Sequence, residues 1–534
     1  MAISKFTSEA IGKANADRGT ALQVQRATSL PVTAKCYIIA LSVLAIFSIG
    51  GFFYWVGIQV VYPYELDYGE GIVLWQAQHV ASLATAYAPL TDYPYIVFHY
   101  PPLYQAVSVG VSKITGDLLL AGRLVSSFSG VGICITLGWL IYRVAPAWVP
   151  RLAATCGAAL AVAFPCGLEV MRWTPLMRVD MLGLWCTFAG LTIFVLARTG
   201  AQRYIALVLL LAAIYTRQTL VAGTVTCLII SSVINFREAV KMLFFTVFLG
   251  GAVLIALSLA THGEVIRHLF LYNLSNRYSI RWAIGALNTN LVSTIPLIAL
   301  AAAAALRPLQ NFARALFNRN PVSLRARLLA SSYNLALFTF TVHFILAGFV
   351  SLSVGKAGSN INYFLEWNLS ACALTSLFVG RLLWSWRKNS ITAVGALPYL
   401  LPMAMLAQQS LSVAHMLVHT EADRRTMAQR AQNSKALERI LRNSPEPLMS
   451  EDMTLLYKAG KHVPFEPAII AELATTGVWN EAPLVNLIRN RTFSVMVIRD
   501  VRSGFYSPTV AAAIIENYRP QEEYGDLTVY VPSQ

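Results

Sequence analysis

The chain has 534 residues, of which 56% are hydrophobic and only 13% are Asp, Glu, Lys or Arg. A soluble protein carries about 25% charged residues, so this composition, with a mean hydropathy of +0.56, excludes a soluble globular protein, a disordered chain and a fibrous repeat. The net charge of +15 would indicate nucleic-acid binding in a soluble domain, but membrane proteins also concentrate Lys and Arg in cytoplasmic loops. We therefore expect an integral membrane protein without a nucleic-acid partner.

A polar, basic tail of residues 1–33 precedes the first apolar segment, 36–60. This segment is too long for the core of a signal peptide and no small-residue cleavage site follows it, so it predicts a retained membrane anchor. Further apolar segments of span-like character follow along the chain. They are 122–141, 152–168, 181–197, 204–216, 219–234, 240–260, 289–306, 328–353, 363–383 and 391–416.

One more apolar segment, 102–115, is too short to cross a bilayer. It follows Pro101 and contains Lys113, and a span needs about 20 residues. When it is interpreted as a periplasmic amphipathic helix in the first outer loop, eleven spans remain and the basic loop 307–327 is cytoplasmic, as the positive-inside rule requires. The N-terminus is then cytoplasmic, the C-terminus lies outside, and 19 Lys and Arg residues lie in cytoplasmic segments against nine in the outer loops of the membrane part.

The composition changes near residue 418. From there to the end the chain holds 13 basic and 14 acidic residues, which is typical of a small soluble domain. A charged amphipathic helix is expected first, and short strand-like and helix-like segments follow it. The expected helix is 421–442, the strand-like segments are 493–498 and 527–531, and the helix-like segment between them is 508–517.

The sequence thus predicts an α-helical integral membrane protein with about 11 transmembrane helices, a periplasmic amphipathic helix in the first outer loop and a small C-terminal soluble α/β domain. The expected domains are a cytoplasmic tail (1–33), a multispanning membrane domain (34–417) and an extracytoplasmic α/β domain (418–534). The expected location is the inner, or plasma, membrane.

Acidic residues gather on the predicted outer side. Glu65, Asp67 and Glu70 directly follow the first span, whereas Glu238 is the only predicted cytoplasmic acid after the N-terminal tail. A charge at the bilayer midplane costs about 2.5–3.5 kcal/mol, so acids near a membrane persist mainly where they are used or solvated. A solvated acidic loop is one interpretation. The many tyrosines around these acids favour another, a carbohydrate platform, because sugar C–H faces pack on aromatic rings while carboxylates accept hydrogen bonds from hydroxyls.

Several short motifs follow one another in a fixed order. The acidic motif at 65–70 (ELDYGE) is followed by an aromatic–Pro-Pro-Leu segment at 99–104 and by an Arg-x-Asp motif at 178–180. The stretches 355–366 and 450–452 complete the set. This ordered set resembles the C-type glycosyltransferase superfamily, in particular bacterial relatives of protein O-mannosyltransferases and aminoarabinose transferases. Those are multispanning membrane enzymes that take a sugar from a polyprenyl phosphate on the outer face.

The resemblance implies transfer of a sugar from a polyprenyl-phosphate donor to a hydroxyl of a glycan, lipid or protein acceptor, with inversion at the anomeric carbon. Many relatives carry adjacent acids after the first span, whereas the acids are spaced here, so two of them are candidates for the base. Asp67 best matches the leading Asp of the family and is the expected base, with Glu70 second. Glu70 and Asp180 would orient the acceptor or a metal. The expected substrate-binding residues are Glu65, Tyr68, His99, Tyr100, Arg178, Arg217, Lys356, Asn360, Asn362, Tyr363 and Glu366.

No cofactor is assigned, and a divalent cation (Mg²⁺ or Mn²⁺) held by Asp67, Asp180 and the donor phosphate stays open as an alternative, since carboxylate oxygens suit both ions. Two other classes of function are also open, a transporter or flippase of a lipid-linked sugar and a non-catalytic, glycan-binding membrane scaffold. Transporters tend to carry midplane charges and inverted repeats. In this sequence the charges gather at one face and no repeat is evident, which favours an enzyme.

Overall fold

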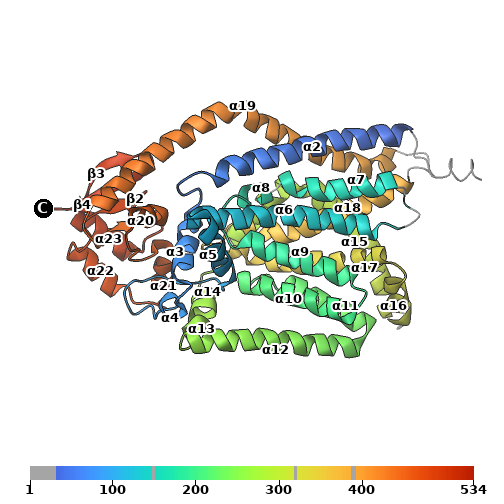
Figure 1. Cartoon of the computed structure of the whole chain (residues 1–534), viewed down its shortest axis with the longest axis horizontal. Coiled ribbons are helices and arrows are strands. Elements are labelled where there is room, and N and C mark those ends of the chain that lie inside the picture. Colours follow the sequence, from blue (N-terminus) through green and yellow to red (C-terminus); the bar gives the residue numbers. More distant parts are fainter. Residues whose placement is uncertain (1–31, 147–148, 150, 168, 318–320, 386–392) are drawn as a thin grey trace, which may run out of the picture.

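A computed structural model describes the chain except for residues 1–31, 147–148, 150, 168, 318–320 and 386–392. The molecule is elongated, with a long helical bundle at one end and a small sheet with short helices at the other (Figure 1). The predicted N-terminal tail lies almost wholly outside the described residues.

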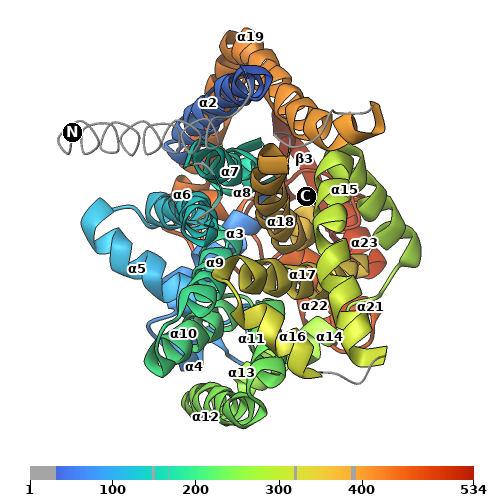
Figure 2. The ribbon, with the colours of Figure 1, turned by 90° about the vertical axis from the view of Figure 1, so that its right-hand side faces the viewer.

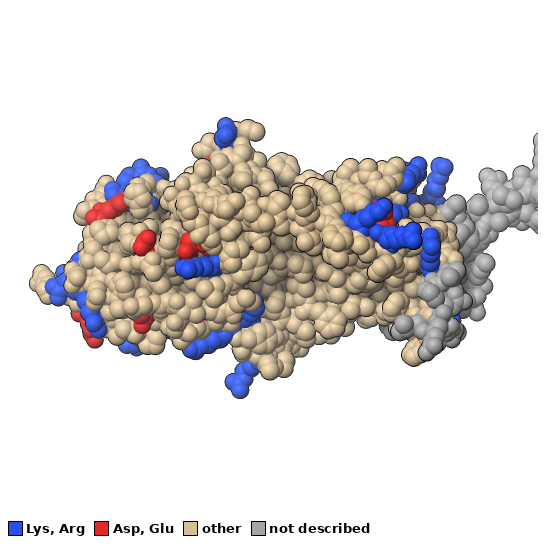
Figure 3. Space-filling model, turned by 90° about the horizontal axis from the view of Figure 1, so that it is seen from below, with Lys and Arg blue, Asp and Glu red and all other residues tan. Residues whose placement is uncertain are grey.

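Within the described part of the chain, five helices of the bundle are long and apolar enough to cross a membrane. They are α2 (Val32–Val60), α6 (Leu118–Val144), α12 (Phe236–Ala260), α15 (Ile280–Phe317) and α17 (Ser332–Ser351). On the face shown in Figure 3, charged side chains lie towards the two ends of the molecule and an uncharged band separates them. Long apolar helices with an uncharged outer surface between charged ends are typical of a multi-pass membrane protein, as the sequence predicted.

The remaining predicted spans also contain helices. They are α7 (Arg151–Ala163), α9 (Asp180–Leu196), α10 (Gly200–Thr216), α11 (Ala222–Ile234), α18 (Leu365–Ser385) and the first part of α19 (Ala393–Asn443). Seen along the bundle, α18 lies near the centre and α12 at the edge (Figure 2), and the burial of their side chains agrees with these positions. The number of crossings and the cytoplasmic position of the N-terminus stay predictions.

Close packing of α9 against α10 brings two functional positions together. A Cβ atom at Gly190 would lie 3.0 Å from the carbonyl oxygen of Ala206 and 2.9 Å from the side chain of Leu210, so only glycine allows this approach. Asp180 is the first residue of α9, and Arg217 is the residue that ends α10. Because the two helices are antiparallel neighbours, these residues meet at one end of the bundle.

The first loop after α2 forms two main helices, α3 (Tyr68–His79) and α5 (Leu103–Thr115), with a short turn of helix, α4 (Leu83–Ala86), between them. Helix α5 has the short length expected of the amphipathic segment 102–115. It leads directly into α6, whose first turn is capped by Asp117, which accepts a hydrogen bond from the backbone N–H of Leu120 (3.0 Å). A position of α5 at the membrane surface stays a prediction.

The C-terminal part is an α/β unit, as expected from its sequence. Its four-stranded sheet has the order β1-β2-β4-β3; β1 pairs parallel with β2, and the other pairs are antiparallel. The strands are β1 (Met449–Ser450), β2 (Met496–Ile498), β3 (Tyr518–Tyr524) and β4 (Leu527–Pro532), and the helices are α20 (Met453–Ala459), α21 (Pro467–Thr475), α22 (Ala482–Arg489) and α23 (Pro508–Asn517). The predicted strands and helix after residue 490 coincide with β2, β4 and α23. The 51-residue helix α19 runs without interruption across the domain boundary expected at 417/418, and that boundary stays a prediction.

The first loop packs between the bundle and the C-terminal unit. Tyr95 forms an isolated parallel bridge with Phe465, and its backbone N–H donates to the carbonyl of Pro464 (2.9 Å). The hydroxyl of Tyr64 donates to Glu438 on α19 (2.9 Å). One hydrophobic cluster therefore includes residues of both the loop and the C-terminal unit, and this cluster fixes the loop that carries Asp67.

Candidate functional site

Asp67 caps the N-terminus of α3. Its Oδ1 accepts hydrogen bonds from the backbone N–H of Gly69 (3.1 Å) and from Nη1 of Arg178 (3.0 Å). Its second oxygen, Oδ2, has no hydrogen-bond partner among the described residues, and 27% of the side chain is exposed. Asp67 is thus an acid held by one oxygen, with the other open to a ligand.

Gly69 is required beside this pair, because the guanidinium of Arg178 passes over its Cα. A Cβ atom at Gly69 would lie 1.2 Å from Nη1 of Arg178 and 3.2 Å from Oδ1 of Asp67. The glycine thus makes room for the ion pair. Sequence analysis did not single out Gly69, although its place inside the acidic motif was the available signal.

Glu70 occupies a different environment from Asp67. Its side chain is fully buried, and its two oxygens accept four hydrogen bonds. Two come from Arg123 on α6 (2.8 and 2.7 Å), and the others from the backbone N–H groups of Leu66 and Met177 (both 2.8 Å). Arg123 in turn donates to the carbonyls of Tyr62 and Tyr64. In this arrangement Glu70 positions the Asp67 loop and has no oxygen left for a substrate.

Arg178 connects Asp67 with Asp180. Its Nε lies 4.0 Å from Oδ2 of Asp180, and its guanidinium carbon lies 5.0 Å from the ring centre of Trp173. Asp180 is fully buried, and its Oδ1 accepts from Arg217 and from Nδ2 of Asn362 (2.9 Å). The structure therefore brings five of the predicted site residues into one chain of contacts from Asp67 to Asn362.

Aromatic rings line this chain. The guanidinium carbon of Arg217 lies 4.5 Å from the ring centre of Tyr363. The ring of Tyr100 contacts the ring of His99 at a tilt of 49°, with 4.1 Å between the ring centres. Burial raises the pKa of Tyr100, and the charges of Arg178 and Asp180 also act on its hydroxyl, which places Tyr100 beside the ionic chain.

His99 is uncharged at neutral pH, because burial lowers the pKa of its imidazole to about 3. Its backbone carbonyl accepts hydrogen bonds from the side chains of Gln218 (3.0 Å) and Asn273 (3.2 Å). Those two contacts fix the peptide that carries Tyr100.

Several buried polar atoms of the site have no hydrogen-bond partner. Among the described residues, the buried atoms without a partner include Nε of Arg178, Oδ2 of Asp180, Oδ1 of Asn362 and Oε1 of Gln218. Buried polar groups are normally paired, so a concentration of unpaired donors and acceptors indicates a place where a polar ligand binds.

The segment 355–366 contributes unequally to the site. Asn362 joins it, whereas Asn360 is exposed and uses its side chain to accept from the backbone N–H of Ile361 (2.7 Å). Glu366 points into the bundle, where its Oε1 lies 3.0 Å from Nε2 of buried His343. Lys356 is half-buried, and its ammonium has no ion-pair partner among the described side chains.

Glu65 and Tyr68 face the C-terminal unit. Oε1 of Glu65 accepts from Arg499 (2.9 Å), and the hydroxyl of Tyr68 donates to Glu466. Burial and the nearby Asp452 raise the pKa of Glu65 well above its ordinary value, while Arg499 opposes this shift. Arg499 was not predicted from the sequence, since no spacing links it to a loop more than 400 residues earlier.

The divalent cation that the sequence left open would need Asp67 and Asp180 as ligands. No group of three or more His, Cys, Asp and Glu side chains in the described part of the chain is placed to hold a metal ion. Oδ1 of Asp67 and Oδ1 of Asp180 are both paired with arginines, and Arg178 lies between the two carboxylates. One oxygen of each carboxylate is thus already paired with a guanidinium group, and the divalent cation stays a prediction.

The chain is similar to known proteins in its fold and not in its sequence. No protein-family model and no curated protein matches the chain. ArnT from Cupriavidus metallidurans bound to undecaprenyl phosphate superposes with a TM-score of 0.52 at 12% identity, over 91% of this chain and 97% of that one. The oligosaccharyltransferase of Archaeoglobus fulgidus, in its apo form, superposes with a TM-score of 0.50 at 12% identity, over 93% of this chain and 74% of that one. The chain has the C-type glycosyltransferase fold.

The C-type fold confirms the resemblance that the ordered motifs indicated. The superposition with ArnT covers nearly the full length of both chains, so the fold includes the C-terminal unit as well as the bundle. At 12% identity the likeness concerns the fold, and the roles of individual residues are argued below from the geometry of this chain.

Proposed function

We propose that this protein is a membrane glycosyltransferase that moves a sugar from a polyprenyl-phosphate donor to an acceptor hydroxyl on the outer face of the membrane. The observation that carries the proposal is the Asp67 carboxylate, held through one oxygen by Arg178 and open at the other. The fold supports it, since ArnT was crystallised with undecaprenyl phosphate and the archaeal oligosaccharyltransferase AglB with a dolichol-phosphate.

Asp67 acts as the base of the reaction. As the acceptor oxygen forms its bond to the anomeric carbon, the acceptor proton moves to Oδ2 of Asp67, and the bond between that carbon and the phosphate oxygen breaks. The electron pair of the broken bond leaves with the polyprenyl phosphate. Attack from the side opposite the leaving group inverts the anomeric configuration.

Cationic side chains hold the phosphate as its charge develops. Arg217 is held by Asp180 and packs on Tyr363, so it enters the reaction already oriented. Nε of Arg178 lies 4.0 Å from Asp180 but makes no hydrogen bond with the described residues, so it can donate to a phosphate oxygen. Lys356 supplies a further positive charge. Donors that are fixed before the reaction stabilise the leaving phosphate without rearrangement.

Asp180, Glu70 and Asn362 act as positioning residues. Asp180 fixes Arg217 and accepts from Asn362, and Glu70 fixes the start of α3 through Arg123. Tyr100 and Tyr363 provide ring faces on which a sugar can pack. Because Oδ1 of Asp67 and Oδ1 of Asp180 are each paired with an arginine, we expect transfer to continue in the presence of EDTA, and loss of transfer would favour the divalent cation.

The test is transfer by the purified full chain in liposomes, measured as release of undecaprenyl phosphate from undecaprenyl-phosphate pentose and hexose donors. Asp67→Asn keeps the cap on α3 but removes the base, so we expect a rate at least 100-fold lower. Asp117→Asn is the matched control, because Asp117 also caps a helix and pairs with a cation, Lys458, away from the ionic chain.

Two results would overturn the proposal. The first is an unchanged transfer rate in Asp67→Asn. The second is movement of the intact donor across the liposome membrane without cleavage of its sugar–phosphate bond, which would favour the flippase interpretation.

A further inference from the structure

A polar cavity lies at the other end of the bundle from Asp67. It has a volume of about 610 Å³. Helix α18 begins next to the ionic chain, and 15 residues beyond Glu366 its Arg381 lines this cavity. At about 1.5 Å per residue the two places are roughly 22 Å apart along that helix, so the cavity is separate from the site of the proposed function.

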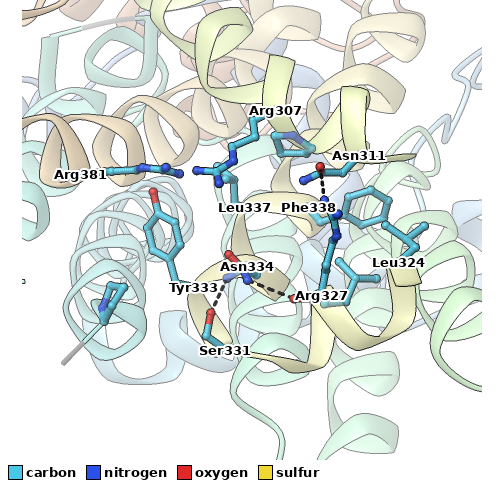
Figure 4. A pocket seen from close by; sticks show the side chains of 13 residues that line it. Arg307, Asn311, Leu324, Arg327, Ser331, Tyr333, Asn334, Leu337, Phe338 and Arg381 are labelled. Carbon is cyan, nitrogen blue, oxygen red and sulfur yellow. Dashed lines mark hydrogen bonds between the residues drawn. The ribbon is translucent and has the colours of Figure 1, made fainter. Parts of the chain in front are cut away.

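Three arginines from three helices line the cavity: Arg307 on α15, Arg327 on α16 (Pro321–Leu329) and Arg381 on α18. Figure 4 shows the side chains of Arg307 and Arg381 extending toward each other across it. Arg327 donates from Nη1 to Oδ1 of Asn311 (2.6 Å), and Nδ2 of Asn334 donates to the carbonyl of Arg327 (3.1 Å). No Asp or Glu is among the described residues that line the cavity.

This arrangement favours an anion. Guanidinium groups repel one another when no counter-charge lies between them, and repulsion across a partly enclosed cavity is stronger than in bulk water. The positive-inside rule explains why arginines occur in this predicted cytoplasmic loop. It depends only on their number, so it does not explain why Arg307 and Arg381 point toward each other. Planar guanidinium groups with several N–H donors match the oxygens of a phosphate.

The surroundings of the cavity indicate a lipid. Leu324, Leu328, Leu337 and Phe338 form apolar parts of the wall. On the outside of α15, Leu306 is 58% exposed, and Leu309 and Phe312 are also exposed. An acyl chain could pack on these side chains while its headgroup enters the polar part of the cavity.

We propose that this cavity binds the phosphate of an anionic membrane lipid, at the end of the bundle opposite to Asp67. The chemistry recognised is a phosphate oxyanion held by Arg307 and Arg381, with Arg327 beside them. Inorganic phosphate offers the same oxyanion without the acyl chains, so it serves as the second probe.

The test is the melting temperature of the purified full chain in a neutral detergent. The protein is titrated separately with phosphatidylglycerol, with phosphatidylcholine and with inorganic phosphate. We expect phosphatidylglycerol to raise the melting temperature, and Arg307→Gln/Arg381→Gln to bind it at least five-fold more weakly. Arg314→Gln is the matched control, because Arg314 lies exposed on the same helix outside the cavity and its loss removes the same charge.

The two probes and the variants distinguish a lipid, a free phosphate ion and no specific site. Arginine-dependent stabilisation by phosphatidylglycerol alone supports the lipid, and equal arginine-dependent stabilisation by inorganic phosphate supports a free phosphate ion in the same site. Stabilisation that is equal in the double variant and in Arg314→Gln, or absent with both probes, overturns the proposal. Arg307→Lys/Arg381→Lys keeps the charges, and partial recovery of binding there excludes a simple folding defect in the double Gln variant.

Discussion

Two acids three residues apart, Asp67 and Glu70, have different environments because of the arginines that they meet. Arg123 binds both oxygens of Glu70 in a fully buried pair, whereas Arg178 binds one oxygen of Asp67. A buried carboxylate with all its hydrogen bonds satisfied contributes to structure, and a partly exposed one with a free oxygen can take up a proton. The geometry of the arginines thus separates two candidates that the sequence could only rank.

Glu70 and Asp67 should therefore differ in their effect on stability. Glu70→Gln leaves the buried guanidinium of Arg123 without a counter-charge, and we expect the free energy of unfolding to fall by about 3–5 kcal/mol. Melting temperature in detergent measures this, and Asp67→Asn should shift it little. Replacing both partners, in Glu70→Met/Arg123→Leu, should restore part of the loss. Equal melting temperatures for Glu70→Gln and Asp67→Asn would contradict this role for Glu70.

We expect acid to destabilise the first loop through His268. Its Nδ1 accepts from the backbone N–H of Phe98 and its Nε2 lies 2.9 Å from the carbonyl of Ala88, which requires the neutral ring. Burial lowers the pKa of His268 to about 4, below the value of about 6.5 in an unfolded chain. A depressed histidine pKa means that the unfolded state binds more protons below pH 6.5, so stability falls as the pH falls from 6.5 towards 4.

With a pKa of about 4 in the folded state, protonation of His268 in the unfolded state lowers the free energy of unfolding at pH 5 by about 2 kcal/mol. We expect the melting temperature to drop between pH 7.5 and pH 5, and to drop less in His268→Gln, whose amide can also donate and accept but does not titrate. The same drop in both proteins would show that His268 is not the group responsible.

At the scale of the element, the N-terminus of α3 is the most constrained part of the site. The helix begins where Asp67 caps it, and Gly69 in its first turn leaves space for Arg178. A side chain at residue 69 would displace the end of a flexible arginine and leave the backbone in place. The fold should tolerate such a change, and the ion pair should not.

Gly69→Ala is thus expected to lower the transfer rate by tenfold or more with little change in melting temperature. The loss of rate comes from displacement of Arg178, which orients Asp67. Gly110→Ala on α5 is the control, since a Cβ atom there meets nothing within 4 Å. An unchanged rate in Gly69→Ala would mean that the pair of Asp67 and Arg178 does not matter for transfer.

Hydropathy predicted the elements well because long apolar runs leave few alternatives to a helix. Every predicted span contains a helix, and the segment 102–115 is a short helix of the expected length. The continuity of α19 was not predicted, because its sequence changes from apolar to charged while its backbone stays helical. The motifs placed Asp67, Arg178 and Asp180 in one predicted site, and the structure brings their side chains into contact. The contacts of Glu65 with Arg499 and of Glu366 with His343 depend on tertiary packing, which no local pattern records.

At the scale of the whole molecule, the C-terminal unit and the first loop form one structure. Arg499 lies among three acids, with 2.9 Å to Glu65, 3.8 Å to Glu451 and 3.2 Å to Asp526. The side chain of Glu65 is 4% exposed and that of Glu451 is fully buried, and among the described residues Arg499 is the ion-pair partner of both. The contact connects the segment next to Asp67 with the sheet.

Arg499→Gln should loosen this contact. Two buried acids would lose their partner, so we expect faster cleavage of the first loop by trypsin and a lower transfer rate, while the bundle stays folded. Glu65→Gln/Arg499→Gln removes one of the stranded charges and should be cleaved more slowly than Arg499→Gln alone. If the single and double variants are cleaved at the rate of the unchanged protein, the contact does not hold the loop.

Helix α19 joins the bundle to the C-terminal sheet without a break, so the number of residues in it determines where the sheet lies and how it is oriented. It is one helix of 51 residues, and Figure 1 shows that it bends between the bundle and the sheet. Seven residues inserted into its charged half would move the sheet by about 10 Å along the axis of that half and nearly keep its orientation about the axis. Two inserted residues would rotate the sheet by about 200° about the same axis. The contact between the sheet and the loop that carries Asp67 therefore depends on the number of residues in the charged half of α19.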